Sequence, residues 1–170
     1  AFAEMVEGYR NPRGGKFQLG LYSVEDHAKM GLRTGATPDG RNARVSLANA
    51  LSPVQGKDTV GPTAVVNSVL KTDLRVATNG MVLDLKFSPS FLESPRHMDA
   101  LRDLINTYCR SGGMEIQFNV VDRATLVDAQ QHPEKHQDLV VRVSGFSAYF
   151  TTLMKTTQDE IIARTEYANM

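Results

Sequence analysis

A single glycine, Gly145, interrupts a short apolar run at residues 139–150. Apolar and β-branched residues on both sides predict a buried strand, where a glycine is unfavourable because it has no side chain to pack. A bulge or the close approach of another backbone would be a purely structural reason for it. Glycine is also suited to hold an unpaired electron at Cα. The radical is delocalised over the neighbouring amide nitrogen and carbonyl, and no Cβ crowds its planar geometry.

The residues around Gly145 form a longer pattern. Arg142-Val-Ser-Gly-Phe-Ser-Ala148, with Gln158-Asp-Glu-Ile-Ile-Ala-Arg-Thr165 behind it, resembles the C-terminal signature of glycyl radical enzymes, the pyruvate formate-lyase superfamily. The resemblance implies that Gly145 stores the radical. The loop residues that would support it are Arg142, Val143, Ser144, Phe146 and Ser147. The family usually has Tyr directly after the glycine, so Phe146 departs from the pattern by one hydroxyl group.

A carbon-centred radical must be kept from water and oxygen, so we expect Gly145 on a buried loop with an apolar shell. The side chains that would form this shell are Val141, Val143, Phe146, Ala148 and Phe150. Charge-assisted hydrogen bonds from Arg142 to backbone carbonyls would anchor the loop.

The resemblance begins near Gly14 and covers most of the chain. Its further segments, in family order, are Gly35–Arg41, Leu51–Gly56, Gly61–Ala64 with Asn67-Ser68, Asn79–Phe87 and Gly113–Val121. It implies an α/β fold that forms the C-terminal part of a ten-stranded α/β barrel. In this interpretation residues 1–80 are the end of the barrel region with long loops, and residues 81–170 are the glycine radical domain.

Hydrophobic periodicity independently predicts α/β structure with crossover connections. Strands are expected at residues 81–87, 114–121 and 139–143, and helices from Pro95 to Gly112 and from Asp122 to Gln131. Three further helix starts are expected at Ser23, at Thr63 and at the capping-box pattern Thr157–Glu160.

Composition narrows the class of protein. Nineteen basic and 19 acidic side chains with a pI near 7.1 argue against a nucleic-acid or membrane-surface role. No run is long and apolar enough to span a bilayer, and no signal pattern opens the sequence. The single cysteine excludes an intrachain disulfide and favours a reducing cytoplasm. The absence of an initial Met suggests a fragment or a processed piece.

Other candidate residues have structural interpretations. Cys109 is expected to be a small core residue in a helix and not the catalytic thiol. The four histidines are interpreted as surface residues and no metal site is predicted, because the close pair His132 and His136 straddles Pro133. Arg41 and Arg44 are expected to make ion pairs or backbone contacts. Gln117 and Asn119 share one strand face, where they could line an active site or hydrogen-bond to neighbouring backbone.

The resemblance also implies what must lie outside these residues. The family's catalytic cysteine is on an upstream loop, so we expect the chain to be inactive alone and to work with an upstream barrel region or a larger subunit. It would bind no cofactor, its radical being installed by a radical S-adenosylmethionine/iron-sulfur activating enzyme, and the full enzyme would be a homo-oligomer. A free-standing radical-bearing subunit that complements a larger partner is the alternative. An α/β binding module with a chance motif is a third reading.

The reaction is left open among dehydratase, decarboxylase, arylalkylsuccinate synthase and formate-lyase types. Leu47–Leu51 and the Ser147-Ala148 pair favour the first three types over formate lyase.

Overall fold

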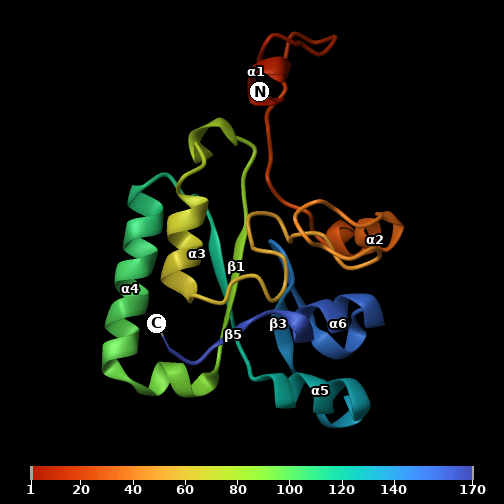
Figure 1. Ribbon diagram of the computed structural model, residues 1–170, viewed down its shortest axis with the longest axis vertical. Coiled ribbons are helices and arrows are strands. Elements are labelled where there is room, and N and C mark those ends of the chain that lie inside the picture. The colour runs from red at the N-terminus through yellow and green to blue at the C-terminus, as the bar shows by residue number, and fades with distance from the viewer. Residues whose placement is uncertain (1, 170) are drawn as a thin grey trace.

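The structure is a computed structural model that describes residues 2–169. Its helices are α1 (Phe2–Glu7), α2 (Asp26–Arg33), α3 (Pro62–Val69), α4 (Pro95–Arg110), α5 (Arg123–Gln131) and α6 (Lys155–Ala163). Its strands are β1 (Leu83–Phe87), β2 (Ile116–Val120), β3 (Val140–Arg142), β4 (Ser147–Tyr149) and β5 (Glu166–Tyr167). Short 3₁₀ turns and long loops connect them (Figure 1).

The strands form two sheets. The larger is parallel, with order β2-β1-β5, and β1 pairs with β2 from Leu83↔Ile116 to Phe87↔Val120. The crossover through α4 that the sequence predicts is therefore present, and the α/β class is confirmed. The smaller sheet is the antiparallel hairpin β3–β4, in which Val141 pairs with Ala148. Sequence patterning did not predict β5, whose two residues are too few to show a period.

Several predicted helix boundaries are confirmed and others are wrong. Asp122 caps α5, its side chain accepting a hydrogen bond from the backbone N–H of Thr125 at 2.6 Å. Three starts differ: α2 begins at Asp26 rather than after Ser23, α3 follows Gly61 rather than Thr63, and α6 begins at Lys155. Thr157 and Glu160 are consequently buried inside α6, and no capping box forms.

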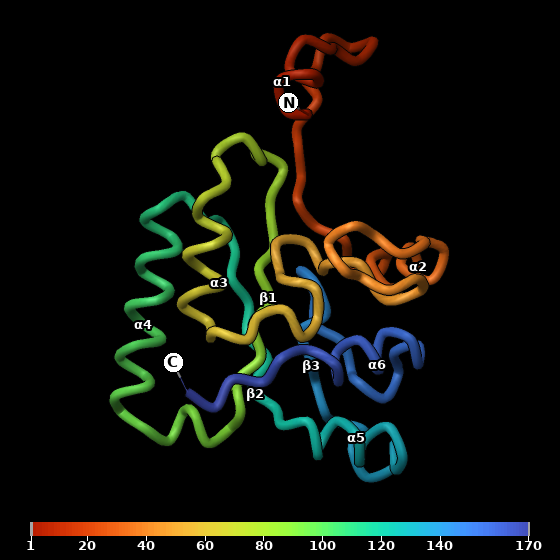
Figure 2. Tube along the Cα trace, viewed as in Figure 1, coloured from red at the N-terminus to blue at the C-terminus, as the bar shows by residue number. Residues whose placement is uncertain are grey.

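Helices pack on two sides of the central strand. Figures 1 and 2 show α3 and α4 on one side of β1, and α2, α5, α6 and the hairpin on the other, while α1 projects away from the body. One apolar cluster joins α3, α4 and β1, and a second joins α5, α6 and the hairpin.

Alternation along β1 separates the two sides chemically. Leu83, Leu85 and Phe87 belong to the first apolar cluster. Asp84 and Lys86 are also buried but point the other way, because successive strand residues face opposite sides of a sheet. Two charged side chains are thus placed beneath the hairpin and α6.

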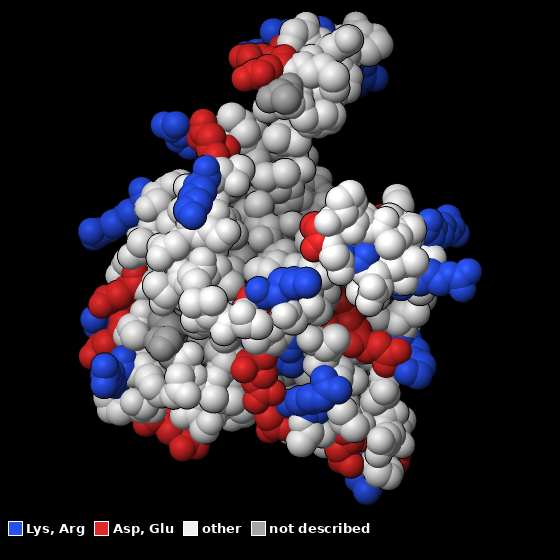
Figure 3. Space-filling model, in the orientation of Figure 1, with Lys and Arg blue, Asp and Glu red and all other residues white. Residues whose placement is uncertain are grey.

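The surface carries no single-sign field on the face seen in Figure 3, where acidic and basic side chains are interspersed. No helix in the described part of the chain is long and apolar enough to cross a membrane.

Candidate functional site

Gly145 is one of the two residues that turn the β3–β4 hairpin. The backbone N–H of Val143 donates to the carbonyl of Phe146 at 2.9 Å, which leaves Ser144 and Gly145 as the turn. Gly145 has φ +84°, a left-handed value that glycine adopts freely. A Cβ built there would lie 3.8 Å from Val82 Cγ2, an ordinary contact. Backbone conformation, and neither a bulge nor close packing, is therefore the structural reason for glycine at this position.

Burial of the loop differs from the prediction. Val141, Val143, Ser144 and Phe150 are buried, but Gly145 itself is exposed at the tip of the hairpin. The apolar side chains expected to cover it belong to, or pack against, the cluster formed with α5 and α6. They therefore fill the base of the hairpin and leave its tip uncovered.

Two amide side chains of β2 hold the hairpin by its backbone. Gln117 Oε1 accepts a hydrogen bond from Gly145 N–H at 3.2 Å. Asn119 brackets the peptide groups of Arg142, accepting from its N–H and donating to its carbonyl, each at 2.8 Å. Both amides are buried on the same strand face, and of the two roles that the sequence allows them, hydrogen bonding to neighbouring backbone is the one that the structure shows.

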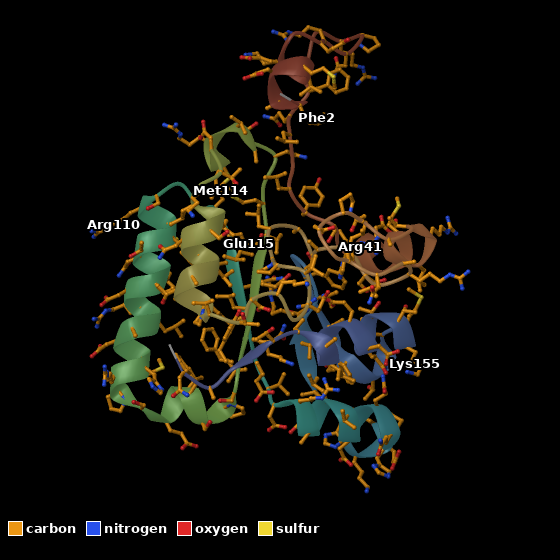
Figure 4. The ribbon with its side chains drawn as sticks, viewed as in Figure 1. Phe2, Arg41, Arg110, Met114, Glu115 and Lys155 are labelled. Atoms are coloured by element: carbon orange, nitrogen blue, oxygen red, sulfur yellow. The ribbon has the colours of Figure 1, made fainter. Side chains whose placement is uncertain are left out.

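The arginine that anchors the loop carbonyls is not the predicted one. Arg142 contacts Gln117 Oε1 at 3.1 Å, Ser147 Oγ at 3.1 Å and Glu115 at 3.5 Å, all of them side chains; Glu115 is labelled in Figure 4. Arg164 donates instead to the carbonyl of Val143 at 2.6 Å and to that of Arg142 at 3.3 Å. Arg164 is the C-cap residue of α6, so the end of this helix supplies the cation that binds the two carbonyls.

Arg164 belongs to a buried ionic cluster. Its side chain is 8% exposed, and its Nη2 lies 2.8 Å from Glu160 Oε2. Glu160 also lies 3.4 Å from His27 Nε2. Burial alone would raise the pKa of Glu160, but Arg164 and then His27 outweigh it and hold the pKa at about 2. His27 was predicted at the surface and is buried, because α2 packs on α6.

Asp84 connects this cluster to the amides. Its carboxylate accepts hydrogen bonds from Asn49 Nδ2, at 2.6 Å, and from Gln117 Nε2, and lies 3.8 Å from Arg164. Asn49 Nδ2 also lies 3.4 Å from the carbonyl of Val143. Burial raises the pKa of Asp84 to about 7, against the opposing effect of Arg164. The turn is therefore seated on a connected set of buried polar groups.

Lys86, the second charged residue of β1, binds the C-terminal end of α6. Its Nζ donates to the carbonyls of Ile161 and Ile162 at 3.5 and 3.3 Å, where a cation stabilises a helix C-terminus. Burial lowers the pKa of Lys86 to about 8.

The remaining candidates are the cysteine and two histidines, and their contacts in the structure are as follows. Cys109 lies in α4 as predicted, but it is exposed and not a core residue, since Leu104 and Tyr108 form the buried face of that helix. His132 and His136 both contact Asp128, at 2.8 and 2.6 Å.

No group of three or more metal-binding side chains occurs among residues 2–169. Arg41, labelled in Figure 4, donates to the carbonyls of Gly35, Asn42 and Val45, so its predicted backbone contacts are confirmed.

Comparison with known proteins identifies the family. Residues 47–151, which include the hairpin and Gly145, match the glycine radical family. The chain belongs to this family. The resemblance seen in the sequence is thereby confirmed, and the chance-motif reading is wrong. The glycine radical domain implies a glycyl radical formed after translation.

Relatives of this glycine radical domain are dehydratases and decarboxylases. The probable dehydratase YbiW of Escherichia coli is 42% identical over 173 residues, which cover 98% of this chain and 21% of that protein. Indoleacetate decarboxylase of Tractidigestivibacter scatoligenes is 44% identical over 146 residues, 85% of this chain and 16% of that protein. The chain spans about a fifth of the length of the first relative and about a sixth of the second, and it matches their C-terminal region.

Solved structures of the family share the fold. The glycerol-bound B12-independent glycerol dehydratase from Clostridium butyricum superposes with a TM-score of 0.94 at 47% identity, covering 99% of this chain and 21% of that one. Hydroxyproline dehydratase from Clostridioides difficile gives 0.91 at 37% identity, covering 99% and 21%.

Proposed function

We propose that Gly145 stores the radical of a glycyl radical enzyme of dehydratase or decarboxylase type. The observation that carries this proposal is the seating of Gly145. It lies within the family-matched residues at φ +84°, its N–H is held by Gln117, and the carbonyl two residues before it is held by Arg164. Both contacts lie on the N-terminal side of Cα, where they fix the Val143–Ser144 and Ser144–Gly145 peptide groups. A fixed peptide nitrogen favours a planar radical, because its orbitals stay aligned with Cα.

The radical would form by loss of one hydrogen atom from Cα. The C–H bond breaks homolytically, the hydrogen atom leaves for a radical generated by a radical S-adenosylmethionine activating enzyme, and one electron stays on Gly145. The exposed tip of the hairpin gives that enzyme access to Cα. In turnover the glycyl radical takes a hydrogen atom from a thiol, which becomes the thiyl radical that attacks the substrate.

The thiol and the cover for Gly145 would come from the upstream barrel region that the relatives' greater length provides. The single cysteine of the sequence, Cys109, lies exposed on α4, a helix packed on the opposite side of β1 from the hairpin. We therefore expect the 170-residue chain to turn over no substrate by itself. Docking of the hairpin tip into that barrel, within a homo-oligomer of the full enzyme, would exclude water and oxygen from the radical.

Activation followed by exposure to air tests the role of Gly145. The activated full enzyme should give an organic radical doublet by electron paramagnetic resonance, and glycine deuterated at Cα should collapse its splitting. Oxygen adds to such a radical and cleaves the backbone, so air should release a fragment beginning near Phe146. Gly145→Ala should give neither signal nor fragment.

Gly40→Ala is the matched control, because Gly40 has φ +89° and open surroundings but belongs to the loop after α2 and not to the hairpin. A radical that persists in Gly145→Ala, or cleavage of protein that was never activated, would show that Gly145 has only a structural role.

A further inference from the structure

Gln117 is placed to act on the nitrogen beside the proposed radical centre. Its Oε1 lies 3.2 Å from Gly145 N and accepts that N–H. The residue is 5% exposed, although Gly145 itself is open to solvent. The peptide nitrogen of an exposed glycine is thus bound to a buried side chain rather than left to water.

The orientation of the Gln117 amide is fixed on every side. Oε1 also accepts from Arg142 Nε at 3.1 Å, and Nε2 donates to the carboxylate of Asp84. A flipped amide would set NH₂ against two donors and the oxygen against a carboxylate, so one orientation is possible. Asp84 is itself held by Asn49 and faces Arg164, and its 6% exposure leaves little solvent to compete.

This arrangement polarises the hydrogen bond at Gly145. A carboxylate that accepts from Nε2 increases the electron density at Oε1, and hydrogen bonds in such a chain strengthen one another. A stronger acceptor at the N–H increases the electron donation of the peptide nitrogen. Electron donation from the nitrogen stabilises a radical at Cα, so spin density moves from Cα onto the nitrogen.

We propose that Gln117, backed by Asp84, is a positioning residue that aligns the Ser144–Gly145 peptide and increases delocalisation of the radical onto its nitrogen. The inference rests on the proposed radical role of Gly145. Gln117 does not touch substrate or take part in hydrogen transfer, and its effect reaches the radical through the N–H alone.

The test compares nitrogen hyperfine couplings in the full enzyme, activated anaerobically after ¹⁵N labelling. In Gln117→Met the acceptor is lost while volume is conserved. We expect a smaller ¹⁵N coupling at Gly145, a larger Cα–H doublet splitting and a roughly fivefold lower radical yield, the factor that one hydrogen bond represents. Gln117→Glu keeps an acceptor oxygen and can share a proton with Asp84, so it should retain the wild-type coupling.

Asn119 provides the matched control. It lies on the same face of β2 with similar burial and binds the hairpin, but at Arg142 rather than at Gly145. Asn119→Ala should lower the radical yield, whereas the radical that does form should keep the wild-type ¹⁵N coupling.

The outcomes separate the two proposals. A wild-type enzyme without a glycyl radical refutes the proposed function. A wild-type radical with an unchanged ¹⁵N coupling in Gln117→Met overturns only the inference about Gln117. If Gln117→Met forms no radical, the test rests on Gln117→Glu. A wild-type ¹⁵N coupling in Gln117→Glu supports the inference, and the absence of a radical in Gln117→Glu overturns it.

Discussion

Replacing Arg164 by Met should remove much of the stability of the chain. The change deletes the cation that contacts Glu160 at 2.8 Å, the carbonyl of Val143 at 2.6 Å and Asp84 at 3.8 Å. Removing one partner of a buried ion pair costs about 3–5 kcal/mol, because the remaining charge stays desolvated and unpaired. We expect a loss of about 4 kcal/mol, which for a chain of this size lowers Tm by roughly 8–16 °C.

The assay is equilibrium urea unfolding of the 170-residue chain at neutral pH, followed by circular dichroism because the sequence has no Trp. Arg102→Met is the control. Arg102 pairs with Asp99 and Asp103, but all three side chains are at least 63% exposed, so the loss should stay below about 0.5 kcal/mol.

A double variant separates charge from packing. Arg164→Met combined with Glu160→Met leaves no unpaired charge in this pair, and much of the lost stability should return. If Arg164→Met lowers the free energy of unfolding by no more than Arg102→Met does, Arg164 does not anchor the hairpin and the ionic cluster does not stabilise the fold.

Three further perturbations test other features of the structure. The pKa of Asp84 is raised from 3.8 to about 7, so between these pH values the folded state binds one proton more than the unfolded state. The free energy of unfolding should therefore fall as pH rises from about 4 to 7. Urea unfolding across this range should show that the decline disappears in Asp84→Asn. Alanine normally stabilises a helix interior relative to glycine, but Gly31→Ala should destabilise the chain by about 1–3 kcal/mol in the same assay. The reason is steric, because the new Cβ would lie 2.5 Å from the carbonyl oxygen of Val45. Cys109 should react with a thiol reagent in the native chain as fast as in urea, and Cys109→Ser should change the free energy of unfolding by less than about 0.5 kcal/mol; slow labelling would mean that it is buried.

Sequence patterns predicted those strands and helix caps that depend on residues close together in the sequence. The strands around residues 81–87 and 114–121 and the cap at Asp122 follow from period and capping chemistry, and the shared face of Gln117 and Asn119 follows from the two-residue repeat of a strand. The division into domains at residue 80 stays a prediction.

What the sequence could not predict depends on tertiary packing. Arg142 lies three residues before Gly145 and Arg164 nineteen residues after it, and only the placement of α6 shows that the more distant arginine reaches the loop carbonyls. His27 is buried because α2 meets α6, a contact that no local pattern encodes. Asp84 did leave a signal, since a carboxylate inside the apolar run 81–87 must find partners.

The contacts that seat Gly145 join residues at very different sequence separations, and this has a consequence for the order of folding. The β3–β4 hairpin spans ten residues and can close within microseconds. Gln117 and Arg164 approach the loop from about 20–30 residues away, whereas Asn49 approaches Val143 across 94 residues. Contacts of such long range, like the parallel pairing of β1 with β5, form slowly, because the chain loses the entropy of loop closure before the contact contributes any stability. During synthesis and after stress the turn would exist before the buried polar groups beneath it are assembled, so the rate at which Asn49 reaches Val143 would set how soon that assembly is complete.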